Sequence, residues 1–126
     1  MMKITDTEGQ IQLSGKTYEG KVKYVCKKMP GGGCAITTFC VLAFGEKAVT
    51  IHFYAKAACE PKEREADYSY DSSDEKETYP WTKSGNLITI NGFDKYGTLR
   101  YENNKLIGSK GDFEGAALEF VEKPTA

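Results

Sequence analysis

The chain has 126 residues, enough for one domain with its own core, and it carries a net charge of −1. This charge balance lacks the basic excess on which non-specific nucleic-acid binding depends, and no apolar run reaches the ~18–20 residues that span a bilayer. Eight Tyr, six Phe and thirteen Gly favour β structure, because aromatic side chains suit a pleated, half-buried surface.

The first predicted strand covers residues 17–26 and follows a polar lead-in over residues 1–14. Gly20 falls in the apolar phase of this strand, where a missing side chain lets the strand bend or a neighbour approach. A loop from Lys27 to Gly33 is expected next. Alternation places the remaining apolar-phase residues on one face: Tyr18, Val22, Tyr24 and Cys26.

Two further strands are expected over residues 35–44 and 48–55, joined by a two-residue turn at Gly45-Glu46. The first of these is apolar on both faces, which is typical of a well-covered strand. The second alternates, with Val49, Ile51 and Phe53 in one phase.

Residues 56–78 form a heavily charged segment with weak periodicity. Pro61 is suited to the first position of a short helical turn. Tyr68 and Tyr70 then indicate a brief strand, which a polar turn over residues 71–74 ends.

The C-terminal half carries two hairpin patterns. In YPWTKSGNLITI, residues 79–90, the turn is predicted at Ser84-Gly85. In TLRYENNKLIG, residues 98–108, the turn is predicted at Asn103-Asn104, because Asn tolerates positive φ. In each hairpin the predicted register puts an aromatic side chain opposite an aliphatic one. The predicted pairs are Trp81 with Ile88, Tyr79 with Ile90, Tyr101 with Leu106, and Leu99 with Gly108.

A last strand over residues 116–122 closes the domain, and residues 123–126 form a tail. The whole chain, residues 1–126, is therefore predicted to be one all-β domain, an antiparallel up-and-down meander of about eight strands. At this strand number a twisted meander closes into a barrel, which removes exposed edges and leaves room inside for side chains or one small ligand.

Three stretches carry a resemblance to a known family. LSGKTYEG, residues 13–20, resembles the opening strand of lipocalin-like (calycin) barrels, with Tyr18 where those barrels have Trp. WTKSGNLITI and TLRYENNKL, residues 81–90 and 98–106, resemble the final hairpins of small bacterial lipocalin-like domains. The resemblance implies an eight-stranded, typically exported barrel that binds small apolar molecules in its mouth.

The stretch CKKMPGGGCAITTFC, residues 26–40, holds three of the four cysteines around three glycines. A phosphate loop would need Lys followed by Ser or Thr after the glycines, and a helix after that. Structural zinc sites use pairs of ligands two to four residues apart, whereas the cysteines here have seven, five and eighteen residues between them. A turn between two strands is the favoured interpretation, and neither a metal nor a cofactor is predicted.

The cysteines allow several pairings, because Cys26 and Cys34 flank the loop while Cys34 and Cys59 lie at the open end of the next hairpin. The pair Cys34–Cys59 is preferred, with Cys26 and Cys40 paired or free. The alternative is that all four are reduced, small hydrophobic residues. A disulfide favours an extracellular or periplasmic protein. The start of the chain shows no signal peptide, so an export signal already removed and a cytoplasmic setting both stay open.

His52 is the only histidine, and a three-residue turn at residues 45–47 would place it opposite Cys40 in a Cys–His dyad. A two-residue turn would put the two side chains on opposite faces, and an exposed strand histidine is the favoured interpretation. The carboxylates of residues 60–77 are expected in a solvated segment, with at most a weak surface cation site around Asp71 and Asp74.

The inward aromatic residues form a tyrosine-rich set, in which each buried hydroxyl needs a partner. They are consistent with a filled core or with an apolar cavity that has a few polar groups. The sequence therefore predicts a non-enzymatic protein that binds a small, largely apolar ligand. The alternative is a secreted interaction module or enzyme inhibitor that uses the loop from Lys27 to Gly33. The candidate ligand-binding residues are Tyr18, Tyr24, Phe53, Tyr68, Tyr70, Tyr79, Trp81 and Tyr101.

Overall fold

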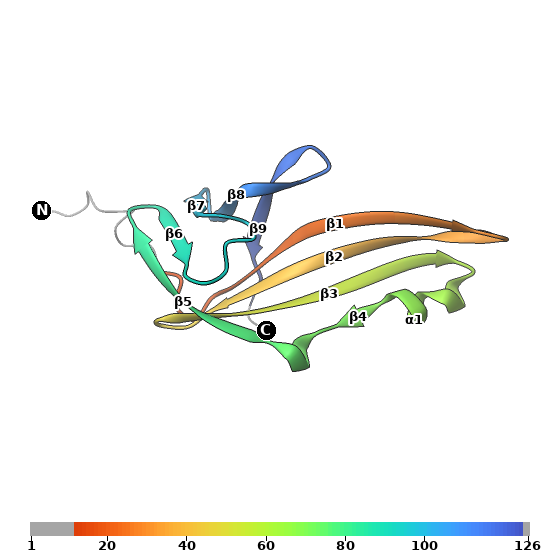
Figure 1. Cartoon of the computed structure of the whole chain (residues 1–126), viewed down its shortest axis with the longest axis horizontal. Coiled ribbons are helices and arrows are strands. Elements are labelled where there is room, and N and C mark those ends of the chain that lie inside the picture. The colour runs from red at the N-terminus through yellow and green to blue at the C-terminus, as the bar shows by residue number, and fades with distance from the viewer. Residues whose placement is uncertain (1–11, 125–126) are drawn as a thin grey trace, which may run out of the picture.

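Nine strands make up most of the chain in a computed structural model that describes residues 12–124 (Figure 1). Most of the predicted lead-in and the last two residues of the predicted tail lie outside the described residues. The elements in chain order are β1 (Thr17–Met29), β2 (Gly32–Phe44), β3 (Ala48–Glu60), η3 (Lys62–Arg64), α1 (Glu65–Tyr68), β4 (Tyr70–Asp71), η4 (Ser73–Glu75), β5 (Glu77–Ser84), β6 (Leu87–Ile90), β7 (Leu99–Glu102), β8 (Lys105–Phe113) and β9 (Ala116–Glu122).

Eight of these strands close into an antiparallel barrel, which confirms the predicted fold class. The order around the barrel is β2-β1-β9-β8-β7-β6-β5-β3, and β3 pairs with β2 to complete the ring. The ninth strand, β4, pairs only with β3 and lies outside the ring. Sequential hairpins account for most of this order, as expected for an up-and-down meander.

The two C-terminal hairpins test the predicted registers. Asn103 and Asn104 form the β7–β8 turn with φ of 52° and 65°, and Tyr101 lies opposite Leu106 as predicted. In the β5–β6 hairpin the predicted turn at Ser84-Gly85 is wrong by one residue. Ser84 pairs with Leu87, so the turn residues are Gly85 and Asn86. Gly85, at φ +63°, takes the first turn position, where a residue without Cβ is favoured.

This one-residue error in the turn shifts the pairing by two residues, so that Trp81 lies opposite Ile90 instead of Ile88. Because side chains alternate with a period of two, a two-residue shift leaves every side chain on its predicted face. Trp81, Ile88 and Ile90 accordingly all contact the core.

The first three strands are longer than predicted, each with 13 residues. Met29 pairs with Gly32, so only Pro30 and Gly31 form the turn, and the predicted loop from Lys27 to Gly33 is largely strand. The paired ends of β1, β2 and β3 run beyond the barrel as a three-stranded arm, residues 23–29, 32–38 and 54–60 (Figure 1).

A bulge in β1 decides which side chains face the core. Lys21 lies opposite Phe39 and Lys23 opposite Thr38, which leaves Val22 as an extra residue. The extra residue reverses the alternation, so Tyr24 does not share the face of Tyr18, contrary to the predicted single face. Tyr18 is fully buried, whereas Tyr24 is 44% exposed on the opposite, convex face of the arm.

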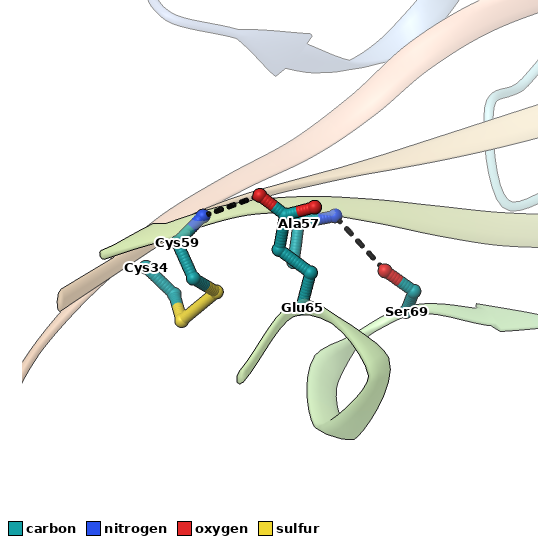
Figure 2. The surroundings of a disulfide bond; sticks show 5 residues. All are labelled: Cys34, Ala57, Cys59, Glu65 and Ser69. Carbon is teal, nitrogen blue, oxygen red and sulfur yellow. Dashed lines mark hydrogen bonds between the residues drawn. A yellow bond between two sulfur atoms is a disulfide. The ribbon is translucent and has the colours of Figure 1, made fainter. Parts of the chain in front are cut away.

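The charged segment between β3 and β5 covers the free edge of β3. β4 pairs with β3 at Ala55, and Ser72 Oγ accepts a hydrogen bond from Phe53 N at 2.9 Å. Farther along, Ser69 Oγ accepts from Ala57 N at 3.2 Å and Glu65 Oε2 accepts from Cys59 N at 3.1 Å (Figure 2). The outward-directed amides of β3 on this edge therefore have hydrogen-bond acceptors, as backbone N–H groups in folded proteins generally do. The short helical turn predicted after Pro61 is present. The brief strand predicted at Tyr68 and Tyr70 is present only from Tyr70, because Tyr68 is the last residue of α1.

The barrel body is filled by side chains. Tyr18 meets Phe44 edge-on at 5.9 Å between ring centroids, and Phe44 meets Trp81 in the same way at 5.3 Å. Every barrel strand except β5 contributes residues to the core, and Tyr79 and Trp81 of β5 are partly buried and pack against it. The fully buried large side chains are Leu13, Tyr18, Leu42, Ile88, Leu99, Leu106, Leu118 and Phe120.

We predict that Gly20→Ala destabilises the barrel by about 1–3 kcal/mol, the usual cost of overpacking. A Cβ at Gly20 would lie 2.8 Å from Glu119 O and 2.8 Å from a ring carbon of Phe120, at the contact that joins β1 to β9. Urea unfolding followed by circular dichroism measures the change in free energy. An unchanged midpoint would mean that β9 can move away without cost.

Candidate functional site

An open cleft of about 1100 Å³ lies where the concave face of the arm meets the mouth of the barrel. One side is formed by β1 and β2, the other by β3 with the segment from β4 to β5, and Lys95 and Tyr96 contribute from the β6–β7 connection. The lining residues are Val22, Lys23, Val25, Lys27, Ile36, Thr38, Ile51, His52, Phe53, Tyr70, Ser72, Glu75, Glu77, Lys95 and Tyr96.

The bulge in β1 supplies part of the apolar floor of this cleft. Because the alternation reverses at Val22, Val25 lies opposite Ile36 on the concave face. Phe53, next to the mouth on β3, adds an aromatic surface, and the Lys95 ammonium lies 5.5 Å from its ring centroid. The floor is thus apolar and continuous with the barrel core.

Tyr96 closes the inner end of the cleft. Its side chain is nearly buried and its ring packs 5.8 Å from that of Phe120. Burial raises the pKa of its hydroxyl, with smaller contributions from Cys40 and Tyr70. The phenol therefore stays protonated at physiological pH and can donate one hydrogen bond toward a ligand.

Charged groups of opposite sign line the two sides of the cleft. Lys23 and Lys27 lie on β1, whereas Glu75 and Glu77 lie beyond β3. The Lys27 ammonium is 5.7 Å from the ring centroid of Tyr68, and the Tyr79 hydroxyl donates a hydrogen bond to Glu77. An apolar floor between polar rims is the usual composition of a site for a small amphipathic molecule.

Of the eight aromatic residues predicted to bind a ligand, Phe53 and Tyr70 line this cleft. Tyr68 lies beside it on α1, in contact with Lys27. Tyr18 belongs to the packed core, where burial, and to a lesser degree the nearby Tyr101 and Glu122, raises its pKa to about 12.

The remaining candidates lie away from the cleft. Tyr24 is on the convex face, where its hydroxyl accepts a hydrogen bond from the Cys26 thiol at 3.2 Å. Trp81 donates through Nε1 to Gly45 O at 3.1 Å, and Tyr101 Oη donates to Asn104 Oδ1 at 3.0 Å. Tyr79 packs against Phe93. The aromatic set is therefore divided between the core, the surface and the cleft.

Several cleft residues were not singled out from the sequence. Val25 and Ile36 were missed because the unbroken alternation assumed for β1 hides the bulge. Lys95 and Tyr96 lie in a connection without periodicity, and only an aromatic residue outside any predicted strand could have pointed to them.

Cys40 and His52 do not form a dyad. Cys40 lies opposite Phe53, and His52 lies opposite Val41, so the two side chains are on opposite faces of the sheet, as expected for a two-residue turn. The His52 side chain is 19% exposed, so it is partly buried and not the exposed strand histidine that was favoured. His52 Nε2 is instead 3.9 Å from Asp71 Oδ1, and His52 is among the residues that line the cleft. Within residues 12–124, no group of three or more His, Cys, Asp or Glu side chains is arranged to hold a metal ion.

The preferred disulfide is present, between Cys34 and Cys59 (Figure 2). The two residues are direct cross-strand partners near the end of the arm. Cys26 is a free, exposed thiol and Cys40 is a free, buried one. Cys26 lies opposite Ala35 and not opposite Cys34, which excludes the other hairpin pairing in this fold.

Comparison of the chain with protein-family models, with curated proteins and with solved structures gave no significant match in any of the three. In the part of the chain that the structure describes, no helix is long and apolar enough to cross a membrane. The cleft and its chemistry therefore carry the functional argument.

We predict that replacing both Cys34 and Cys59 with Ala lowers the free energy of unfolding by about 3 kcal/mol, because the bond closes a loop of 25 residues in the unfolded chain. Urea unfolding without reductant measures the change. Cys26→Ala is the matched control and should leave stability unchanged. Equal midpoints for the wild type and the double variant would contradict the prediction.

A second prediction concerns the two free thiols. Burial raises the pKa of Cys40 to about 12, against a smaller opposing effect of Lys95, so its thiol is protonated and shielded at pH 8. Iodoacetamide at pH 8 should modify Cys26 and leave Cys40 unmodified, as read by peptide mass spectrometry. Modification of Cys40 at a rate near that of Cys26 in the folded protein would show that the buried thiol is accessible.

Proposed function

We propose that the protein is a non-enzymatic binding protein that holds a small, largely apolar molecule in the cleft at the mouth of the barrel. The observation that carries this proposal is the apolar floor of Val25, Ile36 and Phe53 between polar rims, in a cleft large enough for such a molecule. The barrel body is filled, so the ligand lies at the mouth and not along the barrel axis.

The polar groups at the rim set the orientation of the ligand. Tyr96 donates from the inner end, while Lys23, Lys27 and Lys95 offer charged donors farther out. A ligand with an apolar body and one polar end satisfies both parts of the cleft at once. The proposal assigns no covalent or acid–base step to these groups or to His52, which lines the cleft with its Nε2 3.9 Å from Asp71 Oδ1.

An oxidising location, outside the cell or in the periplasm, is part of this proposal. The Cys34–Cys59 bond supports it, because such bonds persist in secreted and periplasmic proteins and are rare in the cytosol.

A secreted interaction module or enzyme inhibitor is the second candidate. The projecting arm supports it, because its Pro30-Gly31 tip stands clear of the barrel with Lys28 exposed beside it (Figure 1). A partner at the tip would lose affinity when Lys28 and Met29 are substituted, whereas small-molecule binding in the cleft would persist.

We predict that the neutral apolar probe N-phenyl-1-naphthylamine binds the protein and that Ile36→Glu weakens this binding at least tenfold. The substitution places a carboxylate on the apolar floor, where it must remain hydrated. Leu87→Glu, on an exposed outward position of β6, is the matched control and should bind as the wild type does. Probe fluorescence in a titration measures both, and failure of the wild type to bind any apolar probe would overturn the proposed function.

A further inference from the structure

The two edges of the arm differ in how their backbone groups are satisfied. The β3 edge is covered by β4 and by the side chains of Ser72, Ser69 and Glu65. The β1 edge is paired with β9 only from Tyr18 to Gly20, and over the rest of β1 no strand in residues 12–124 pairs with that side. The fold therefore closes one edge of the arm and leaves the other open.

The open edge directs backbone groups outward. In an antiparallel ladder, alternate residues bond to alternate sides. Phe44 N donates a hydrogen bond to Lys16 O, so the even-numbered residues of β2 direct their backbone N–H and C=O groups toward β1. Lys23 and Val25 lie opposite Thr38 and Ile36. Tyr24 and Cys26 alternate with Lys23 and Val25 along β1, so they direct their N–H and C=O groups away from β2.

The open edge is also strongly basic. β1 holds four lysines and one glutamate, in a chain whose net charge is −1. The bulge distributes these lysines over both faces of the strand. Lys21 and Lys28 are on the convex face, opposite Phe39 and Gly33, and Lys23 and Lys27 are on the concave one.

A groove begins where β1 and β9 part. Its volume is about 470 Å³, and it is lined by Lys21, Phe39, Phe113 and Val121 among others. The groove gives an apolar contact beside the first open residues of β1. An extended segment that pairs with the edge could place one apolar side chain there.

We propose that the edge of β1 from Lys21 to Met29 binds an extended, acidic segment of another protein by adding it as a further strand. Backbone hydrogen bonds to Tyr24 and Cys26 supply affinity, and carboxylates opposite the lysines supply selectivity. This proposal is separate from the small-molecule site.

A second copy of this chain is disfavoured as the occupant. Pairing of two β1 edges would set lysines against lysines, which is a common device against edge-to-edge association. The β3 edge of a second copy, which the acidic segment covers, is not available for pairing either. Its amides already donate to Ser69, Ser72 and Glu65.

The test uses a fluorescein-labelled peptide of eight residues, Glu-Glu-Val-Val repeated twice, which carries glutamates on both faces of an extended strand. Fluorescence anisotropy should show binding at least tenfold tighter than that of the same peptide with lysine in place of glutamate. The double variant Lys21→Glu/Lys28→Glu should bind the peptide at least tenfold more weakly than the wild type. It should bind the apolar probe with unchanged affinity, because neither residue lines the cleft. Lys47→Glu, in the β2–β3 turn at the other end of these strands, is the control and should bind as the wild type does.

Two further measurements make the proposal falsifiable. The glutamate peptide N-methylated at every backbone amide keeps its charge but cannot pair with the edge, so it should fail to bind. Equal binding of the methylated peptide, or unchanged binding by the double variant, would overturn strand addition. Concentration-dependent dimers in sedimentation that the double variant abolishes would assign the edge to a second copy and also overturn it.

Discussion

The closure of this barrel depends on a short contact between its first and last strands. β1 and β9 pair over three residues, Tyr18 to Gly20, and at Gly20 the backbone and ring of β9 approach so closely that no Cβ would fit. The remaining barrel contacts join strands that are closer along the chain, through a turn or, for β3–β5 and β6–β7, through a longer connection. The β1–β9 pairing is the one that brings the two ends of the chain together, and it depends on the absence of a side chain at a single position.

The shortness of this contact also produces the rest of the architecture. β1, β2 and β3 have 13 residues each, so most of their length continues past the barrel as the arm. Where the sheet extends beyond the barrel it has two free edges, and these two edges differ in this protein. The acidic segment after β3 bonds to one edge, while lysines line the other. The cleft lies between the concave face of the arm and the barrel mouth, so it exists because the strands are longer than the barrel needs.

The disulfide and the short helix act together on the outer half of the arm. Cys34–Cys59 links β2 to β3, and α1 contributes Glu65 and Ser69 to the adjacent amides of β3 (Figure 2). A three-stranded extension without a second layer buries little apolar surface. Covalent and hydrogen-bonded links to β3 hold the arm in register and so hold the floor of the cleft in place.

The candidate site was only partly predictable. Phe53 and Tyr70 were expected to face a ligand and line the cleft, but Tyr18, Trp81 and Tyr101 were expected there and lie elsewhere. Sequence periodicity gives the face of a side chain and not its position along a barrel, so core and mouth residues look alike. Lys95 and Tyr96 reach the cleft from a connection that has no periodic signal.

The sequence by itself determined the all-β class, the meander, the face of each C-terminal hairpin residue and the Asn103-Asn104 turn, because alternation and turn chemistry are local properties of the chain. Only the tertiary structure decided the bulge at Val22, the pairing of Cys34 with Cys59 among the possible bonds, and the extension of three strands into an arm. These features depend on which strand lies beside which and in what register. Such contacts join residues far apart in the chain, and no local pattern encodes them.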